Sequence, residues 1–233
     1  MGEINIGALR SVSGRLDAVR LSYAFTGGAV VNLLLDHPDL SPARPTDDVD
    51  VIVELASDER YSSIETKLRE SGFEHDMSEG APKCRWRLGL LVVDIMPTRG
   101  EGIGLNTKWF DEVLSEAQPI NYAGTTLRVV SPVGLLVLKY LTFCERGEHD
   151  YYASHDLEDF ITVIDGRAGI VGEIDAASAE FRLYLIRAVG DLLGESDFRE
   201  ALGGHLPADS TSQLRLSGLR SKLNAIAALE RGR

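Results

Sequence analysis

The chain has 233 residues and a formal net charge of −12, from 36 acidic and 24 basic side chains. Hydrophobic residues make up 44% of it and charged residues 26%, which is typical of a globular protein with a full hydrophobic core. No apolar run approaches the roughly 18 residues of a membrane span, so we expect no membrane partner. The acidic excess argues against sequence-independent binding of nucleic acid through a broad basic face.

The sequence also carries signals about its compartment. Its first residues lack the basic stretch and apolar core of a secretory signal. Two cysteines, Cys84 and Cys144, lie far apart without CxxC spacing, which favours reduced thiols over a disulfide. Together these features predict a cytoplasmic protein.

The first 130 residues alternate between helix and strand patterns. Apolar side chains recur at helical spacing over residues 8–22, "YAFTGG" predicts a short strand that ends at a glycine pair, and "AVVNLLLDH" predicts a helix. A proline-rich loop then leads to a strand over residues 49–55. The helix after this strand has Ser57 as its N-cap and Gly72 just past its last turn.

The next segments add more strands. "CRWRLGLLVVDIMP" is long enough for two strands and stops at Pro97. "TKWFDEVLSEA" predicts a short helix, and "PINYAGTTLRVVS" predicts a hairpin around Ala123 and Gly124. Strands and helices that alternate in this way indicate a mixed sheet with helices packed on it.

From Ser131 onwards the pattern is almost wholly helical. "SPVGLLVLKYLTFCERG" opens with a serine cap and a proline in the first helical position, and three further helical segments follow. The sequence therefore predicts an α+β protein, with a small mixed β-sheet domain over residues 1–130 and an α-helical C-terminal domain over residues 131–233.

An acidic cluster stands at the start of the strand over residues 49–55. Asp is among the residues that strands least favour, yet "TDDVDV" places Asp48 and Asp50 two residues apart, on one face, with Asp47 turned away. Two such carboxylates repel each other unless a cation lies between them, and Mg²⁺ prefers oxygen ligands of this kind. Asp94, alone in the apolar run "LLVVDIMP", is the candidate for a third acid on a neighbouring strand.

Each of these features also has a purely structural interpretation. Asp47 and Asp48 can end a turn, and the glycine pair can be a plain turn as well. Asp94 can simply form an ion pair with Arg85 or Arg87. The joint arrangement, rather than any single residue, favours a site.

That joint arrangement resembles the nucleotidyltransferase superfamily, which has the polymerase-beta-like fold. Its pattern is an apolar residue followed by Gly and then Gly or Ser, a later Asp–apolar–Asp–apolar segment, and a third acid on a further strand. "FTGG" with Gly27 and Gly28 matches the first part, "DVDV" with Asp48 and Asp50 the second, and Asp94 the third.

The C-terminal half resembles the AbiEii-like branch of that superfamily, the nucleotidyltransferase toxins of abortive-infection and type IV toxin–antitoxin systems. In that branch a Lys on the helix after the sheet is followed by a basic–Asp–x–x–Asp motif. Lys139 matches the Lys, and Asp156 and Asp159 match the two acids, while His155 stands where Lys or Arg is usual.

The resemblance implies an enzyme that transfers a nucleoside monophosphate from a nucleoside triphosphate (NTP) to an acceptor and releases pyrophosphate. Mg²⁺ or Mn²⁺ would be the cofactor, as two ions that clamp the attacking and leaving oxygens. Asp48 and Asp50 would bind both ions, and Asp94 would bind the second ion and take the acceptor's proton. With Lys139, these are the implied catalytic residues.

The resemblance also implies a set of nucleotide-binding residues. Glycines let the backbone approach a triphosphate, and the helix after them directs N–H groups towards it. Thr46 is as well explained as a turn residue and Arg44 as a solvated loop residue. Lys139 is as well explained by snorkelling at the edge of an apolar face, and Asp156 by the helix dipole. The implied set is Thr26, Gly27, Gly28, Arg44, Thr46, Lys139 and Asp156.

The sequence leaves three alternatives for the acceptor and the function open. A tRNA or other RNA, or a protein hydroxyl, would fit the toxin branch, which also implies a cognate antitoxin. A cationic aminoglycoside would fit the net charge of −12 better than tRNA does. A catalytically inactive module that binds a nucleotide or a partner is the third alternative, against which three intact aspartates argue.

Overall fold

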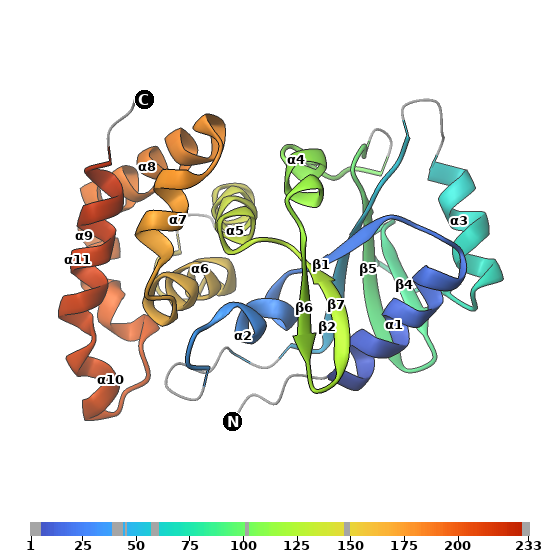
Figure 1. The fold of residues 1–233 in the computed structure, drawn as a ribbon, viewed down its shortest axis with the longest axis horizontal. Helices are drawn as coiled ribbons and strands as arrows, with labels where there is room; N and C mark the ends of the chain where they lie inside the picture. The colour runs from blue at the N-terminus through green and yellow to red at the C-terminus, as the bar shows by residue number, and fades with distance from the viewer. Residues whose placement is uncertain are drawn as a thin grey trace. The chain divides into compact units, whose positions relative to one another are not determined.

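A mixed β-sheet organises the first half of the protein. The computed structural model describes residues 6–38, 44, 46–56, 61–100, 103–146 and 150–229. Within these residues the sheet has seven strands in the order β3-β4-β5-β2-β1-β7-β6 (Figure 1). The strands are β1 (Tyr23–Thr26), β2 (Asp48–Val53), β3 (Glu74–His75), β4 (Arg85–Leu88), β5 (Leu91–Pro97), β6 (Gln118–Tyr122) and β7 (Thr125–Val129).

The register of the four central strands aligns one row of polar residues across the sheet. β2 runs parallel to β5, with Asp50 opposite Asp94, and antiparallel to β1, with Thr26 opposite Asp50. β4 runs antiparallel to β5 and places Arg85 opposite Asp94. Thr26, Asp50, Asp94 and Arg85 therefore occupy one line across β1, β2, β5 and β4.

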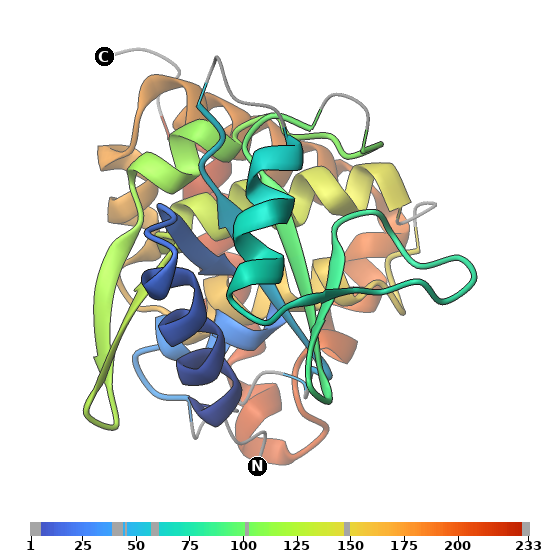
Figure 2. The same ribbon diagram turned by 90° about the vertical axis from the view of Figure 1, so that its right-hand side faces the viewer.

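The alternation of β2 explains how a strand with two aspartates is stable. Val49, Val51 and Val53 are buried, at 5%, 0% and 0% exposure. Because successive side chains point to opposite faces, the valines fill the core on one face and the aspartates stand on the other. Helices α1 (Ile6–Ala18) and α3 (Tyr61–Glu70) lie side by side in front of the sheet in Figure 2.

The sheet and the C-terminal helices form two compact units. The sheet unit takes its described residues from 6–33 and 46–131, and the helical unit takes Pro132 onwards with the described residues of 34–44. The remaining helices of the sheet unit are η1 (Gly28–Val30), α2 (Val31–Leu34) at its border, and α4 (Phe110–Ser115). The helical unit contains α5 (Pro132–Arg146), α6 (His155–Gly166), α7 (Ile170–Ala176), α8 (Ala179–Gly194), α9 (Ser196–Ala201), η2 (Leu202–His205), α10 (Ser210–Leu214) and α11 (Leu216–Ala227).

The helical unit has its own core and its own caps. Phe160, Phe181 and Phe198 are fully buried. Ser154 and Ser178 cap α6 and α8, since each side chain accepts a hydrogen bond from a backbone N–H in the first turn. Lys222 of α11 donates to three carbonyl oxygens at and just beyond the C-terminal end of α6, at 2.8, 2.7 and 3.0 Å.

The α+β class, the pair of strands in "CRWRLGLLVVDIMP" and the hairpin at Ala123–Gly124 are confirmed. The helix predicted over "AVVNLLLDH" was too long, because it ends at Leu34. Beyond that point the Asp36 N–H donates to Gly166 O at 3.1 Å, so the backbone bonds to α6 rather than continuing a helix. β3, α7 and α9 were not predicted, and the Ser57 cap lies outside the described residues.

No helix in the described part of the chain is both long and apolar enough to cross a bilayer.

Candidate metal centre

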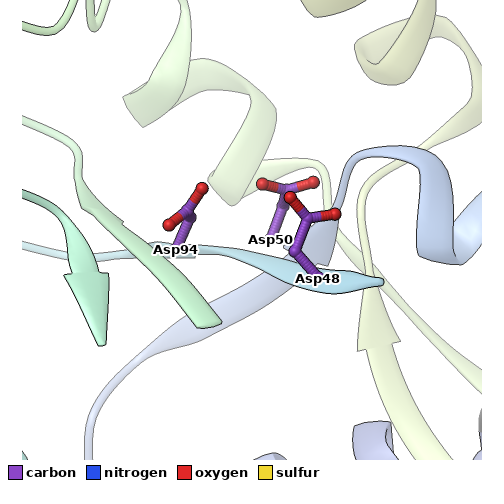
Figure 3. A group of neighbouring side chains, drawn as sticks. All are labelled: Asp48, Asp50 and Asp94. Atoms are coloured by element: carbon purple, nitrogen blue, oxygen red, sulfur yellow. The ribbon is translucent and has the colours of Figure 1, made fainter. Parts of the chain in front are cut away.

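Three aspartates from two adjacent strands converge in the sheet unit. Asp48 and Asp50 on β2 and Asp94 on β5 each direct a carboxylate to the same side of the sheet (Figure 3). One oxygen from each lies within 4.8 Å of the others. The sequence predicted this geometry from the two-residue spacing and from the isolated acid in β5. The role of the three residues as metal ligands remains a prediction.

Backbone pairing holds the carboxylates together. Asp48 and Asp50 share a face because they are two residues apart on one strand. Asp94 joins them because it lies directly opposite Asp50 in the β2–β5 register. All three are half-buried, so the surrounding protein lowers the local dielectric without sealing the carboxylates from solvent.

Gly27 makes room for this arrangement. Its φ of +72° lies in the left-handed region that favours glycine. A Cβ at this position would stand 1.8 Å from Asp50 Oδ2, so any other residue would collide with the carboxylate. Thr26, directly opposite Asp50, is buried at 4% exposure. The glycine pair is therefore a close approach of backbone to Asp50, and more than a plain turn.

The segment after Gly27 is less helical than the sequence predicted. Gly28 begins a single 3₁₀ turn, η1, and α2 adds only four residues. A helix this short carries little of the dipole that the prediction assigned to it.

Arg85 forms an ion pair with Asp94 and lies near Asp48. Its Nε donates to Asp94 Oδ1 at 2.8 Å and its Nη2 donates to Asp94 Oδ2 at 2.7 Å. Nη2 also lies 3.9 Å from Asp48 Oδ2. The hydrogen bonds to Asp94 raise the pKa of Arg85 further above its usual value, so the guanidinium is always charged.

The sequence left open whether Asp94 pairs with Arg85 or with Arg87, and the structure shows that its partner is Arg85. Arg87 pairs instead with Asp76, at 3.1 Å from its Nε. The Arg85 pair does not disqualify Asp94 as a metal ligand, because an ionised carboxylate offers about four lone-pair sites and a bidentate Arg uses two of them.

Cys84 lies beside the aspartates but is poorly suited to bind a metal. Burial, followed by the negative charge of Asp94, raises the pKa of the Cys84 thiol to about 11. The side chain is therefore a neutral thiol at physiological pH, whereas metal ligation and nucleophilic attack need the thiolate.

The donor set fits a hard divalent cation. Carboxylate oxygens suit Mg²⁺ and Mn²⁺, and a metal–oxygen bond of about 2.1 Å places opposite ligands about 4.2 Å apart. Adjacent ligands of such an ion lie about 3 Å apart, so oxygens that all lie within 4.8 Å of one another reach this range by a movement of their side chains. The absence of a side chain at Gly27 supports the same fit, because the Asp50 carboxylate takes its position in the space that a Cβ would fill.

The helical unit holds a second charged group, centred on Lys139 of α5. Lys139 is buried at 8% exposure, and its Nζ lies 2.7 Å from Asp159 Oδ2 and 2.9 Å from Asp156 Oδ1. Arg44 Nε lies 3.6 Å from Asp159 Oδ1. Burial disfavours the lysine's charge, but Asp159 and Asp156 outweigh it and raise the pKa of Lys139.

This group modifies two interpretations of the sequence. Asp156 lies in the first turn of α6 and also bonds to Lys139, so it complements the helix dipole and pairs with the lysine at the same time. Lys139 has the nearly complete burial of a structural ion pair, rather than the exposed head of a snorkelling lysine. Sequence reasoning missed Asp159 as its closest partner, although the i, i+3 spacing of the two acids on one helix was a signal.

The remaining predicted residues have local contacts. Thr46 Oγ1 donates to Asp48 O at 3.4 Å, which is the behaviour of a turn residue at the entry to β2.

The predicted site residues fall into two groups, one in each unit. Asp48, Asp50, Asp94, Thr26, Gly27, Gly28 and Thr46 belong to the sheet unit, whereas Lys139, Asp156 and Arg44 belong to the helical unit.

Comparison with known proteins identifies solved structures with a similar fold. No protein-family model and no curated protein matches the sequence. Among solved structures, an antigenic nucleotidyltransferase-like protein from Paracoccidioides brasiliensis aligns with 20% identity, covering 85% of this chain and 91% of that chain, at a TM-score of 0.54.

Two structures of the antibiotic-resistance factor ANT(2'')-Ia are also similar, and one of them is in complex with adenylyl-2''-tobramycin. They share 16% and 15% identity with this chain, cover 70% and 69% of it and 84% and 88% of their own chains, and have TM-scores of 0.46. The protein has a nucleotidyltransferase-like fold, as the Paracoccidioides brasiliensis structure shows. The AbiEii-like branch remains a prediction.

The close approach at Gly27 generates the first prediction. Gly27→Ala should lower the affinity for Mn²⁺ at least about tenfold, because the new methyl group must displace the Asp50 carboxylate. Gly89→Ala is the matched control, since Gly89 also has positive φ, at +61°, but a Cβ there has nothing within 4 Å. Both variants should lose about 1 kcal/mol of stability from the positive φ, and Gly27→Ala should lose more because its methyl group also collides with Asp50. Equal Mn²⁺ affinity by titration calorimetry would contradict the assignment of Asp50.

The Lys139 group generates the second prediction. Lys139→Met should lower the free energy of unfolding in urea by about 3 kcal/mol, because it leaves Asp156 without its cation and Asp159 with only the more distant Arg44. Protonation of an unpaired acid removes this penalty, so the loss should be smaller at pH 5 than at pH 8. Adding Asp159→Asn should restore part of the stability. An unchanged unfolding midpoint for Lys139→Met would show that the ion pair is dispensable and leave Lys139 available as a ligand residue.

Proposed function

We propose that the protein is a metal-dependent nucleotidyltransferase, which transfers a nucleoside monophosphate from an NTP to an acceptor hydroxyl and releases pyrophosphate. The observation that carries the proposal is the convergence of Asp48, Asp50 and Asp94 within 4.8 Å on one side of the sheet. Three carboxylates this close repel one another unless a cation lies between them. In a protein with a nucleotidyltransferase-like fold, such a group can bind the metal that accompanies a nucleotide.

The reaction divides into bond changes that the residues can assist. The acceptor oxygen forms a bond to the α-phosphorus, the bond from that phosphorus to the pyrophosphate oxygen breaks, and the acceptor loses a proton. A bound divalent metal supplies positive charge at the attacking and leaving oxygens. We assign Asp48 and Asp50 to hold the metal against the triphosphate, and a carboxylate oxygen of Asp94 to hold metal and to receive the proton.

The backbone at the glycine pair has a binding role in this proposal. We assign backbone N–H groups at Gly27 and Gly28 to phosphate oxygens, because a glycine puts no side chain between the main chain and a ligand. The Thr26 hydroxyl stands in the same row as Asp50. For Lys139, contact with the triphosphate rests on the sequence resemblance alone, and its bonds to Asp156 and Asp159 support a structural role instead.

Two classes of acceptor are supported by different observations. The match of Lys139, Asp156 and Asp159 to the AbiEii-like motif supports a tRNA or protein acceptor, and with it a toxin that a cognate antitoxin neutralises. The net charge of −12 supports a cationic small molecule of the aminoglycoside type, because an acidic protein attracts cations. The same charge repels a polyanion such as tRNA. A catalytically inactive binding module gains nothing from three converging carboxylates.

Transfer of label from the four α-³²P-NTPs tests the function. With Mg²⁺ or Mn²⁺ present, wild type should label one of three acceptors: total RNA, cell protein or an aminoglycoside. Asp48→Ala should reduce the rate by at least about 100-fold, because charge stabilisation supplies most of the catalysis in such transfers. Asp47→Ala is the matched control, since it removes an exposed acid next in sequence, and its rate should be unchanged.

The labelled acceptor identifies the substrate class. Label in RNA or protein favours the toxin branch, and label in the aminoglycoside favours the small-molecule alternative. No label in any acceptor, together with no metal-dependent binding of NTP, would contradict an enzyme and leave the binding module.

A further inference from the structure

Arg85 forms an ion pair with Asp94, which lies on β5, whereas the other two aspartates lie on β2. Both oxygens of Asp94 accept hydrogen bonds from its guanidinium, at 2.8 and 2.7 Å, and the same Nη2 lies 3.9 Å from Asp48 Oδ2. The β4–β5 register places Arg85 directly opposite Asp94, so this contact is built into the sheet. A fixed positive charge therefore stands within ion-pair distance of two of the three proposed metal ligands.

The exposure of the pair shows that solvent reaches the guanidinium. The Arg85 side chain is 29% exposed and the Asp94 side chain is 13% exposed. In the neighbouring pair the Arg87 side chain is 46% exposed and the Asp76 side chain only 4%. Because the contact with Asp94 is bidentate, a ligand with two matching oxygens can replace the carboxylate, and the charge of the metal centre changes directly with that exchange.

A count of charges shows the consequence. The three carboxylates carry −3, and Arg85 reduces this to −2, which balances one divalent cation but not two. A second cation would be repelled by both the first cation and the guanidinium until further negative charge arrives. The triphosphate of an NTP brings that charge. Its oxygens can also accept two hydrogen bonds from the planar guanidinium of an Arg, just as a carboxylate can.

We propose that Arg85 is a resident counter-ion of the metal centre, which keeps divalent metal binding weak until a nucleotide is present. On nucleotide binding the guanidinium exchanges Asp94 for phosphate oxygens and releases the Asp94 carboxylate to the metal. Arg85 is thus a positioning residue that links metal occupancy to the nucleotide. This inference rests on the proposed function, because it assumes that Asp48, Asp50 and Asp94 bind metal.

Mn²⁺ titrations with and without a non-hydrolysable NTP analogue test the inference, read by calorimetry and by the electron paramagnetic resonance signal of free Mn²⁺. Without nucleotide, Arg85→Gln should bind Mn²⁺ roughly tenfold more tightly than wild type, because one repulsive charge is gone. The analogue should then strengthen Mn²⁺ binding less than it does in wild type. Arg85→Lys, which keeps the charge, should stay close to wild type in the absence of nucleotide.

Arg87→Gln is the matched control, because it removes the same charge from the same strand two residues away and should leave Mn²⁺ affinity unchanged. Equal or weaker Mn²⁺ binding by Arg85→Gln would overturn the inference and make Arg85 a fixed support for Asp94. If Arg85→Gln does not fold, a crystal structure of wild type with Mn²⁺ and the analogue decides, because Asp94 still bonded to Arg85 there would overturn the inference.

Asp48→Asn separates this inference from the proposed function. Mn²⁺ binding that Asp48→Asn abolishes, with no effect of Arg85→Gln, overturns the counter-ion alone and leaves the metal centre intact. Mn²⁺ binding that Asp48→Asn does not change overturns the metal centre and the counter-ion together.

Discussion

The pairing of β2 with β5 is the constraint on which the proposed site depends. Asp50 stands opposite Asp94 only in this register, and a shift by one residue would turn every side chain of β2 to the other face. The buried valines at 49, 51 and 53 prevent such a shift, because it would expose them and bury the acids. The core on one face of the strand therefore fixes the carboxylates on the other, and Gly27 keeps the neighbouring backbone clear of them.

The ion pairs of Lys139 and Arg85 show how burial separates structural from exchangeable ion pairs. Lys139 has a side chain that is 9% exposed and two acids within 2.9 Å, so leaving that pair would strand charges in the core. Arg85 also faces two acids, but its side chain is 29% exposed and water can replace its contacts. The first pair holds helices α5 and α6 together, and the second can respond to a ligand.

Local patterns in the sequence predicted what depends on local physics. The period of two in "DVDVIV" predicted a half-buried strand with both aspartates on one face, and the lone charge in "LLVVDIMP" pointed to Asp94. Long-range pairing was beyond the sequence. Nothing local chooses Arg85 over Arg87 for Asp94, and the i, i+3 spacing of Asp156 and Asp159 places both acids on one face of α6 without showing which lies closer to Lys139. The helix after the glycines was too long in prediction, because Asp36 bonds to the distant Gly166.

A crystal structure with Mn²⁺ and a non-hydrolysable NTP analogue, using anomalous scattering to locate the metal, tests the central claim most directly. Our account predicts an anomalous peak bonded to oxygens of Asp48 and Asp50 and to the triphosphate, with Asp94 contacting a second ion and its bonds to Arg85 broken. An analogue bound away from these aspartates, or bound beside them with no metal between, would contradict the account.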